Sequence, residues 1–396
     1  MKINLIETLS CVSRIVDLIH PKLNLHHVRT AFIAWNLARE AYFSPAQCRK
    51  TLLAALLHDI GGLNEESRLE PLSYCDNELN NHALIGGELL AGIPLLNPLS
   101  DIVRYHHTHW DNGKGKMIDA DYVPEESHVI YLADRIDVLL ANYRSENIST
   151  MREVLTEIIL DGSHTLYKPE YVQAFRKMAK RDHFWAVMQS TRYQDYIQEI
   201  PRIYNDSLSL HNFRDISSLL AFVIDEFSQE NVQHSLMVGR ISGYLANEIG
   251  IAPEQCLKVE IAGLLHNIRS LDRYAKPDSH DVEEQTWQAL APIEGMGEIA
   301  DWCRLLHVSV REKPYPFEAD ILLASHSLAT LLGKASSLML FQDQITTIAD
   351  IPPVLAHLAR QRSAALMQIA QESAKERREL VTRIAQLNKA LNREKR

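Results

Sequence analysis

The sequence predicts an all-α protein that contains a duplicated helical unit and ends in a long charged helix. Apolar residues recur at steps of three and four in stretches such as 28–42 and 48–60, which is the periodicity of a packed helix. Alternating runs rich in Val, Ile and Thr, which would indicate strands, are scarce. With 396 residues, 46% of them hydrophobic, the chain is long enough for two or three packed domains.

Short motifs mark where the first helices begin and end. Ser44 is expected to cap a helix whose first residue is Pro45, because a serine oxygen accepts from free N–H groups and proline needs no donor there. Gly61 and Gly62 are expected to end the helix that carries residues 58–59. The polar segments 64–80 and 111–127 are expected to be loops.

An internal repeat relates the two halves of the chain. Residues 26–60 align with 234–268 without a gap, with 14 identities in 35 positions, which is beyond chance. Each copy keeps a pair of histidines at the same spacing, His26 and His58 in the first and His234 and His266 in the second. Duplication of a helical unit is the simplest account.

Composition and pattern divide the chain into four segments. We expect a first domain over 1–190, a polar linker over 191–212, a second domain over 213–350, and a C-terminal helical segment over 351–396. In that last segment Leu380, Ile384, Leu387 and Leu391 are spaced as a heptad seam. The seam predicts a coiled-coil homodimer, and the alternative is one amphipathic helix lying on its own domain.

Charge and cysteine content exclude several classes of protein. A formal net charge of −10 is unfavourable for binding duplex nucleic acid, which requires clustered Lys and Arg. The five cysteines are far apart and include no C-x-x-C pair, so we expect reduced thiols in a cytoplasmic protein. No apolar run is long enough for a signal peptide or a membrane span.

Residues that can bind metal ions are spread over the first domain, on or beside helical patterns. They are, in order, His26 or His27, His58 with Asp59, His82, His106 with His107, and Asp134. A buried carboxylate needs a cation or strong donors, because burying it alone costs several kcal/mol. The set exceeds one tetrahedral site and suits two transition-metal ions that share a carboxylate. The other histidines of this domain are expected to be structural, namely His20, His128, His164 and His183.

The ordered series resembles the HD superfamily of metal-dependent phosphohydrolases, and within it the HD-GYP phosphodiesterases. The likeness covers roughly residues 15–190 and rests on the stretches HHVRTAFIAWNLA, LLAALLHDIGG, NHALIGGELL, VRYHHTHWDNG and LADRIDVLLANYR. It implies tandem HD-type helical domains, with the second copy degenerate. It also implies two divalent ions, iron first and manganese or zinc next, and a cyclic dinucleotide or another nucleotide as ligand.

The resemblance also assigns roles to residues. It implies that one metal is held by His26, His58, Asp59 and Asp134, and the other by Asp59, His82, His106 and His107, with Asp59 bridging. His26 is favoured over His27 because His234 aligns with it. Three features depart from the family pattern: Gly62 stands where the family has lysine, Thr108 where it has glutamate, and the Gly-Tyr-Pro signature is missing.

The second copy is expected to have kept its helices and lost its metals. Asn267 replaces Asp59, and a neutral amide bridges two cations poorly. His280 and His307 are the remaining candidates, and Ser325 is expected at the position of Asp134. His266 is then expected to be a buried histidine held by hydrogen bonds.

Two functions follow from these features. The first is a phosphodiesterase in a signalling protein, in which Asp59 holds the metals and His109, Lys114 or Lys116 assists the leaving oxygen. The second is a sensor that uses a binuclear, di-iron site to bind a nucleotide or dioxygen and relays the signal through the C-terminal helix. Metal content followed by a phosphodiesterase assay would discriminate between them.

Overall fold

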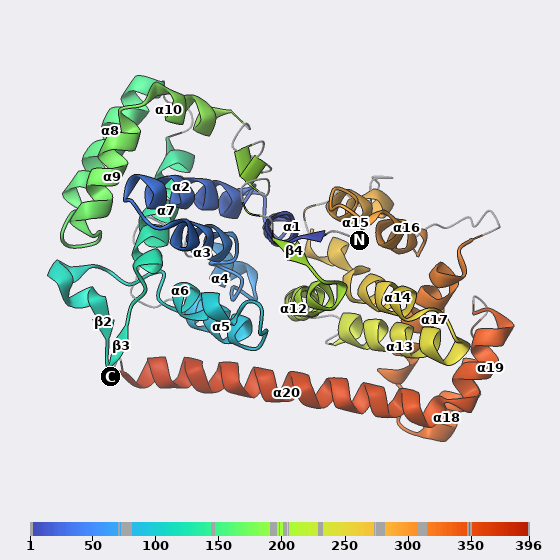
Figure 1. Cartoon of the computed structure of the whole chain (residues 1–396). Helices are drawn as coiled ribbons and strands as arrows, with labels where there is room; N and C mark the ends of the chain where they lie inside the picture. The colour runs from blue at the N-terminus through green and yellow to red at the C-terminus, as the bar shows by residue number, and fades with distance from the viewer. Residues whose placement is uncertain are drawn as a thin grey trace. The chain divides into compact units, whose positions relative to one another are not determined.

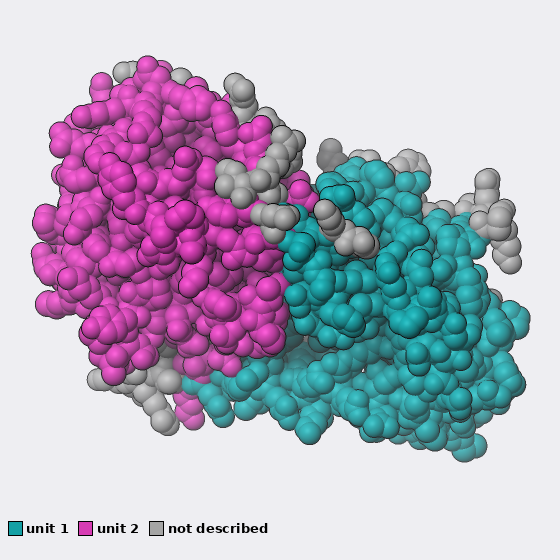
Figure 2. All heavy atoms as spheres, in the orientation of Figure 1, with its two compact units in different colours: residues 1–4, 207–386 teal, residues 5–206, 387–396 magenta. Residues whose placement is uncertain are grey.

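The structure is a computed structural model of the whole chain. It describes residues 3–69, 72, 81–143, 147–190, 196–197, 199–200, 204, 206–228, 233–272, 274, 282–306, 315–346, 348 and 351–394. The predicted all-α class is confirmed (Figure 1). The described residues form two compact units: unit 1 comprises Met1–Asn4 and Ser207–Gln386, and unit 2 comprises Leu5–Asp206 and Leu387–Arg396 (Figure 2).

Unit 2 contains the residues that the sequence analysis gives as candidate metal ligands. Its helices are α1 (Leu5–Asp17), α2 (His26–Glu40), α3 (Pro45–Leu56), α4 (Glu65–Leu69), α5 (Asn81–Ala91), α6 (Ser100–Arg104), α7 (Glu125–Asn142), α8 (Ile148–Asp161), α9 (Pro169–Ala179) and α10 (Asp182–Gln189). The most buried of them is α7, which packs against α2 and α3. A short antiparallel hairpin, β2 (Met117–Ile118) with β3 (Asp121–Tyr122), precedes α7.

Unit 1 is built in a similar way. Its helices are α12 (Leu210–Ser228), α13 (His234–Ile249), α14 (Pro253–Leu265), α15 (Val282–Leu290), α16 (Gly297–Leu305), α17 (Phe317–Leu332), α18 (Leu338–Ile345) and α19 (Pro353–Gln361). The long α20 (Ser363–Glu394) begins in this unit. A two-stranded antiparallel pair, β1 (Ile3–Asn4) with β4 (Ser207–Leu208), joins two distant parts of the chain. In this unit α13 packs against both α14 and α17.

Local sequence explains several element boundaries. Ser44 accepts a hydrogen bond from the Gln47 N–H and its own N–H donates to the Gln47 side chain, with Pro45 as the first helical residue. This capping box confirms the predicted start of α3. In both units the helix that begins with histidine is preceded by a left-handed residue, Leu25 before α2 and Gln233 before α13.

Two helix ends differ from the sequence prediction. The helix α3 ends at Leu56, so His58 and Asp59 lie in the following turn rather than on the helix. Similarly, α6 ends at Arg104, before His106 and His107. The reason is the same in both places, because the histidine ring bonds a carbonyl three residues earlier and the turn directs its other nitrogen inward.

The predicted loops are partly structured. Residues 65–69 form α4, residues 111–116 form a 3-10 turn, and α7 already begins at residue 125.

Among the described residues Cys11, Cys48, Cys256 and Cys303 are free thiols. The part of the chain that the structure describes contains no helix that is both long and apolar enough to cross a bilayer.

Candidate active site

The turn after α3 places two ligands at the centre of unit 2. His58 donates from Nδ1 to the carbonyl of Ala55 at 2.8 Å, which leaves the lone pair of Nε2 facing inward. Asp59 is 1% exposed, and its Oδ2 lies 3.4 Å from His58 Nε2. The turn continues into Gly61, where a Cβ atom would lie 2.2 Å from the carbonyl oxygen of His82. Glycine is therefore required for α5 to approach the turn.

The first residue of α2 faces the same point. His26 Nε2 lies 3.8 Å from Asp59 Oδ2 and 3.3 Å from Asp134 Oδ1. Its Nδ1 bonds Asp137 at 2.8 Å, and Asp137 in turn accepts two hydrogen bonds from Arg29. This carboxylate–histidine arrangement is typical of metal ligands, because it fixes the tautomer and the orientation of the ring.

The opposite side of Asp59 is covered by α5 and by the turn after α6. His82 Nε2 lies 3.1 Å and His106 Nε2 3.5 Å from Asp59 Oδ1. The Nε2 atoms of His82 and His107 lie 3.0 Å apart. His106 donates from Nδ1 to the Val103 carbonyl. The two oxygens of Asp59 therefore face two separate groups of histidines, as a bridging ligand would.

Asp134 completes the group around His26. It lies in the buried middle of α7, where its Oδ2 accepts from Arg135 at 2.7 Å. Its Oδ1 lies 3.3 Å from His26 Nε2 and 4.0 Å from His58 Nε2. One carboxylate oxygen is thus neutralised by arginine, and the other faces the histidines.

The centre has more lone pairs than hydrogen-bond donors. Six residues have buried atoms with no hydrogen-bond partner that point toward this centre: Nε2 of His26, His27, His58 and His106, both oxygens of Asp59, and Oδ1 of Asp134. Such orphaned atoms are costly unless a ligand satisfies them. A set of imidazole nitrogens and carboxylate oxygens fits first-row divalent metal ions.

The electrostatics of the protein alone are consistent with cation binding. Burial lowers the pKa of His26, but the nearby carboxylates of Asp134 and Asp137 more than offset it and raise the value to about 10. Burial disfavours the ionised Asp59, yet His58 and His82 hold its pKa well below the ordinary value. The carboxylates are therefore ionised in the core and require positive charge nearby, from a proton or from metal ions.

The predicted ligands come together in this structure. The ligand atoms of Asp59, His82, His106 and His107 lie within 4.8 Å of one another, and so do those of His26, His58 and Asp59. His27 also faces the centre, because its Nε2 lies 3.9 Å from Asp59 Oδ2 while Nδ1 contacts Asp17. The choice of His26 stays a prediction, which the Asp137 contact favours.

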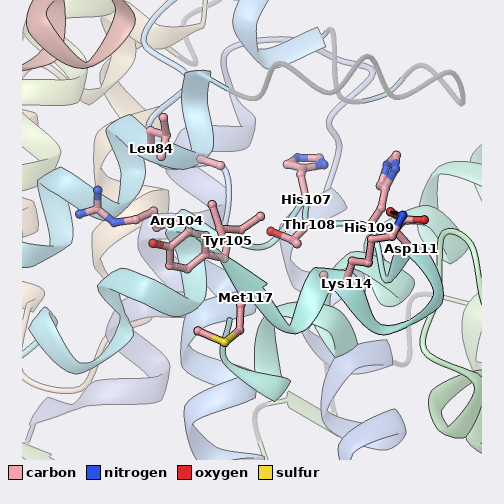
Figure 3. A pocket seen from close by; sticks show the side chains of 12 residues that line it. Leu84, Arg104, Tyr105, His107, Thr108, His109, Asp111, Lys114 and Met117 are labelled. Atoms are coloured by element: carbon pink, nitrogen blue, oxygen red, sulfur yellow. Dashed lines mark hydrogen bonds and ion pairs between the residues drawn. The ribbon is translucent and has the colours of Figure 1, made fainter. Parts of the chain in front are cut away.

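A pocket of about 400 Å³ opens beside His107 (Figure 3). It is lined by Ala83, Leu84, Arg104, Tyr105, His107, Thr108, His109, Asp111, Lys114, Gly115, Met117 and Ile118. Its volume is in the range of small-molecule sites. Sequence analysis missed Arg104 and Tyr105, which lie on α6 and in the turn after it; their position just before the two histidines was the available signal.

The three residues predicted to assist the leaving group are placed differently. His109 and Lys114 line the pocket, and Lys114 pairs with Asp111 at 3.0 Å. Lys116 is not one of the lining residues, and its ammonium group lies 5.3 Å from the centre of the Trp110 ring. This placement favours His109 and Lys114 over Lys116 for contact with a ligand.

The histidines expected to be structural have local partners. The Nδ1 atom of His20 accepts from the Lys22 N–H, and His183 bonds the hydroxyl of Tyr196. His128 packs edge-on against Trp110, and burial lowers its pKa. His164 has a left-handed backbone in the turn after α8. Within the described residues none of them belongs to the groups around Asp59.

Unit 1 brings three histidines together as well. His234 Nε2 lies 3.0 Å from His326 Nδ1, which lies 3.2 Å from His266 Nε2. His280 and His307 lie outside the described residues. The prediction that Ser325 occupies the position of Asp134 is wrong by one residue. Proline caps both helices, and Asp134 and His326 each follow that proline by ten positions, counted from Pro124 and Pro316.

The fold and this site define a class of protein. Residues 25–139 match the HD domain family. A crystal structure described as a cyclic GMP-AMP-specific phosphodiesterase of V. cholerae superposes with a TM-score of 0.60 at 14% identity, over 93% of this chain and 98% of that one. At that identity the likeness concerns the fold. The chain therefore carries an HD-type domain over residues 25–139 and resembles the HD-GYP proteins of the HD phosphohydrolase superfamily.

Two curated relatives are phosphodiesterases whose names specify a cyclic dinucleotide. A 3'3'-cGAMP-specific phosphodiesterase of Vibrio cholerae is 28% identical over 277 residues, which are 68% of this chain and 64% of that protein. A cyclic di-GMP phosphodiesterase of Thermotoga maritima is 27% identical over 185 residues, 44% of this chain and 50% of that protein. The chain thus spans between half and two thirds of the length of these two relatives.

Proposed function

We propose that unit 2 is a metal-dependent phosphodiesterase that hydrolyses a cyclic dinucleotide. One observation carries the proposal: the group of buried, unpartnered nitrogens and oxygens around Asp59 lies directly beside a pocket of small-molecule size. His107 belongs to both, since it contacts His82 in the centre and lines the pocket. The relatives whose names specify cyclic dinucleotides support this class of substrate.

In this proposal the ligands are divided between two metal ions. His26, His58 and Asp134 would hold one ion, His82, His106 and His107 the other, and Asp59 both. When bound, a pair of divalent ions supplies Lewis acidity toward a phosphodiester and its attacking water. Iron is the expected metal, with manganese or zinc as alternatives that accept the same ligands.

The pocket residues would bind and orient the substrate. Arg104 and Lys114 can offer positive charge to phosphate oxygens, because both side chains line the pocket. Thr108 and His109 follow His107 directly, so they lie where a scissile phosphate close to the metals would place its leaving oxygen. His109 is the better candidate for donating a proton, because a neutral threonine hydroxyl is a poor acid.

Arg68 occupies the space beside Gly62, the position at which the family has lysine. Gly62 leaves no lysine side chain, and its Cβ position is filled by the side chain of Arg68. Arg68 is buried and donates from Nε to the Gly62 carbonyl, which places a guanidinium beside the HD turn. Its charge is held inside the protein, so it stabilises the turn rather than reaching the pocket.

Assembly and the second unit are part of the proposal. We infer that unit 1 is a divergent HD-type copy, because its helices begin as those of unit 2 do: α13 and α2 follow a left-handed residue, α14 and α3 begin with proline, and α17 and α7 follow a proline. Pairing of two chains through the second half of α20 stays a proposal: Leu380 and Leu387 are half-buried, Ile384 is buried within the single chain, and the side chain of Leu391 lies outside the described part. The domain limits predicted at 1–190, 191–212, 213–350 and 351–396 are proposed as the folding segments.

The test compares turnover in protein of known metal content. Protein loaded anaerobically with iron, or with manganese, is assayed on 3'3'-cGAMP, cyclic di-GMP and bis(p-nitrophenyl) phosphate. We expect Asp59→Ala to lower activity at least about a hundredfold, because the ligand shared by both ions is lost. Lys114→Ala should raise KM more than it lowers kcat, whereas Lys50→Ala, an exposed lysine on α3, should change neither.

One result would refute the phosphodiesterase and favour the sensor function. If the protein holds two metal ions and turns over none of these substrates above the Asp59→Ala background, the hydrolase assignment is wrong. Nucleotide binding to the same loaded protein, measured calorimetrically, then decides whether the pocket is a ligand sensor.

A further inference from the structure

We propose that unit 1 holds a single divalent metal ion, of the zinc class, on His234, His266 and His326. This site is separate from the binuclear centre, and the proposal does not depend on the activity of unit 2. It also revises the expectation that the second copy lost every metal. The three nitrogens that would bind the ion are His234 Nε2, His266 Nε2 and His326 Nδ1.

The spacing of the three nitrogens fits one ion. A zinc–nitrogen bond of about 2.0–2.1 Å places two nitrogens on the same ion roughly 3.0–3.4 Å apart, depending on the coordination geometry. His326 Nδ1 lies 3.0 Å from His234 Nε2 and 3.2 Å from His266 Nε2, and all three nitrogens lie within 4.8 Å of one another. In unit 2 a contact of the same length, 3.0 Å, joins His82 Nε2 and His107 Nε2, which belong to the other ligand group and are assigned to one ion in the binuclear proposal.

Two of the three rings keep the geometry of the first site. The ring centroids of His234 and His266 lie 5.3 Å apart with an interplanar angle of 64°, and those of His26 and His58 lie 5.3 Å apart at 62°. His266 Nδ1 donates to Gly263 at 2.7 Å, as His58 Nδ1 does to Ala55. The copy has thus retained the orientation of both rings, as well as their identity.

The third ligand explains why the site was not visible in the repeat. His326 occupies the position of Asp134 on α17, so the trio His26–His58–Asp134 has become three histidines. Asp59 has become Asn267, which removes the bridging oxygen that serves the second ion. Because the oxygen that would bridge two ions is lost while three ligands remain, we expect one ion rather than two or none.

Hydrogen bonding alone satisfies the trio less well. Because His266 Nδ1 uses its proton on Gly263, its Nε2 has a lone pair and no proton when the ring is neutral. His326 Nδ1 can then either donate to His266 Nε2 or accept from His234 Nε2–H, so only one of the two contacts can be a hydrogen bond at a time. A metal ion instead accepts a lone pair from each of the three rings.

The surroundings define what kind of ion and ligand set to expect. Three neutral imidazoles with an open fourth position match zinc sites that complete their coordination with water or an anion. Two of the rings are buried and His326 is partly exposed, so an ion can enter from the side of α17.

The experiment separates the two sites in the full-length chain. In a variant with His58→Ala, Asp59→Ala and His82→Ala, which breaks both ligand groups of unit 2, the protein should still bind about one Zn²⁺ or Co²⁺ per chain. Adding His326→Gln should weaken that binding at least about tenfold and abolish the visible absorption of bound cobalt. His326→Asp should retain binding, because aspartate serves at this position in the first site. His357→Ala, at a histidine on α19 that bonds Gln361, is the control and should change nothing.

Two outcomes would overturn the proposal. One is that no ion binds once the centre of unit 2 is removed, and the other is that His326→Gln leaves binding and the cobalt spectrum unchanged. If the variant that lacks the ligands of unit 2 does not fold, the metal content of wild type is compared directly with that of His326→Gln. Wild type should then contain one more ion per chain than the variant, and equal metal content would refute the site.

Discussion

Gly61→Ala should break the candidate active site without touching any predicted ligand. A Cβ atom at residue 61 would lie 2.2 Å from the His82 carbonyl oxygen and 2.3 Å from the Gly86 amide nitrogen. Both are backbone atoms of α5, so no side-chain rotation relieves the contact. Either α5 or the turn after α3 has to move.

The size of the movement follows from these distances. Ordinary contact begins at 3.4 Å, so the separation has to grow by about 1.2 Å from 2.2 Å. Metal–ligand distances tolerate only about 0.2 Å. His82, whose Nε2 lies 3.1 Å from Asp59 Oδ1, would be carried away with α5 and would leave the ion on that side with an incomplete ligand set.

The expected result is loss of one metal ion and of stability. Overpacking of a core costs about 1–3 kcal/mol, and backbone-to-backbone contact should give the upper end of that range. For a unit of this size the unfolding temperature should fall by roughly 4–12 °C. Elemental analysis and calorimetry measure the two effects.

Gly92→Ala is the matched control, because Gly92 follows the same helix and a Cβ there meets its nearest neighbour at 3.5 Å. It should keep both ions and the wild-type unfolding temperature. If Gly61→Ala behaves like Gly92→Ala in both measurements, the close approach of α5 does not position His82, and the proposed second ion site is misassigned.

Two further predictions concern unit 1 and assembly. Burial raises the pKa of Asp225 to about 7, although both oxygens accept from the Ser235 N–H. Because the folded pKa exceeds the unfolded value, the stabilisation is complete below about pH 4 and is lost as pH rises toward 7. In metal-free protein, the unfolding temperature of Asp225→Asn should therefore fall less than that of wild type between pH 5 and 8. The same fall in both proteins would contradict this prediction. For α20, glutamate at the half-buried Leu380 and Leu387 should reduce the dimer in light scattering, whereas Gln386→Glu, at an exposed position, should not; an unchanged dimer places the interface elsewhere.

The ligand types and their order could be predicted from the sequence, because metal chemistry restricts the choice to histidine and carboxylate and helical spacing separates candidates from surface residues. Their exact placement could not. His58 and Asp59 were expected on a helix, but a bond from the ring to Ala55 holds them in the turn that follows. Such local side-chain bonds compete with the helix and leave little trace in periodicity.

The pocket and the third histidine of unit 1 depend on tertiary packing. Arg104 is the last residue of the short helix α6 and Tyr105 follows it, and only the approach of the 111–118 segment makes them pocket residues. Ser325 was chosen in place of His326 because the alignment from the first histidines does not extend to α17. Counting from the proline that caps each helix restores the register, since that proline fixes where the helix begins.

The two sites together indicate how one substitution separates binding from chemistry. In unit 2 the ionised Asp59 lies between two groups of histidines and offers one oxygen to each. A neutral Asn267 at that position cannot offset the charge of a second ion, so two cations a few ångströms apart would repel each other without compensation. The remaining trio in unit 1 can still hold one ion, which ties together α13, α14 and α17. On the proposed function, phosphodiester hydrolysis by a metal pair would be confined to unit 2, and a metal in unit 1 should stabilise the fold without adding turnover. Restoring aspartate with Asn267→Asp should raise the metal content of unit 1 only if further ligands face the new carboxylate, and measuring that content tests whether the bridge alone was lost.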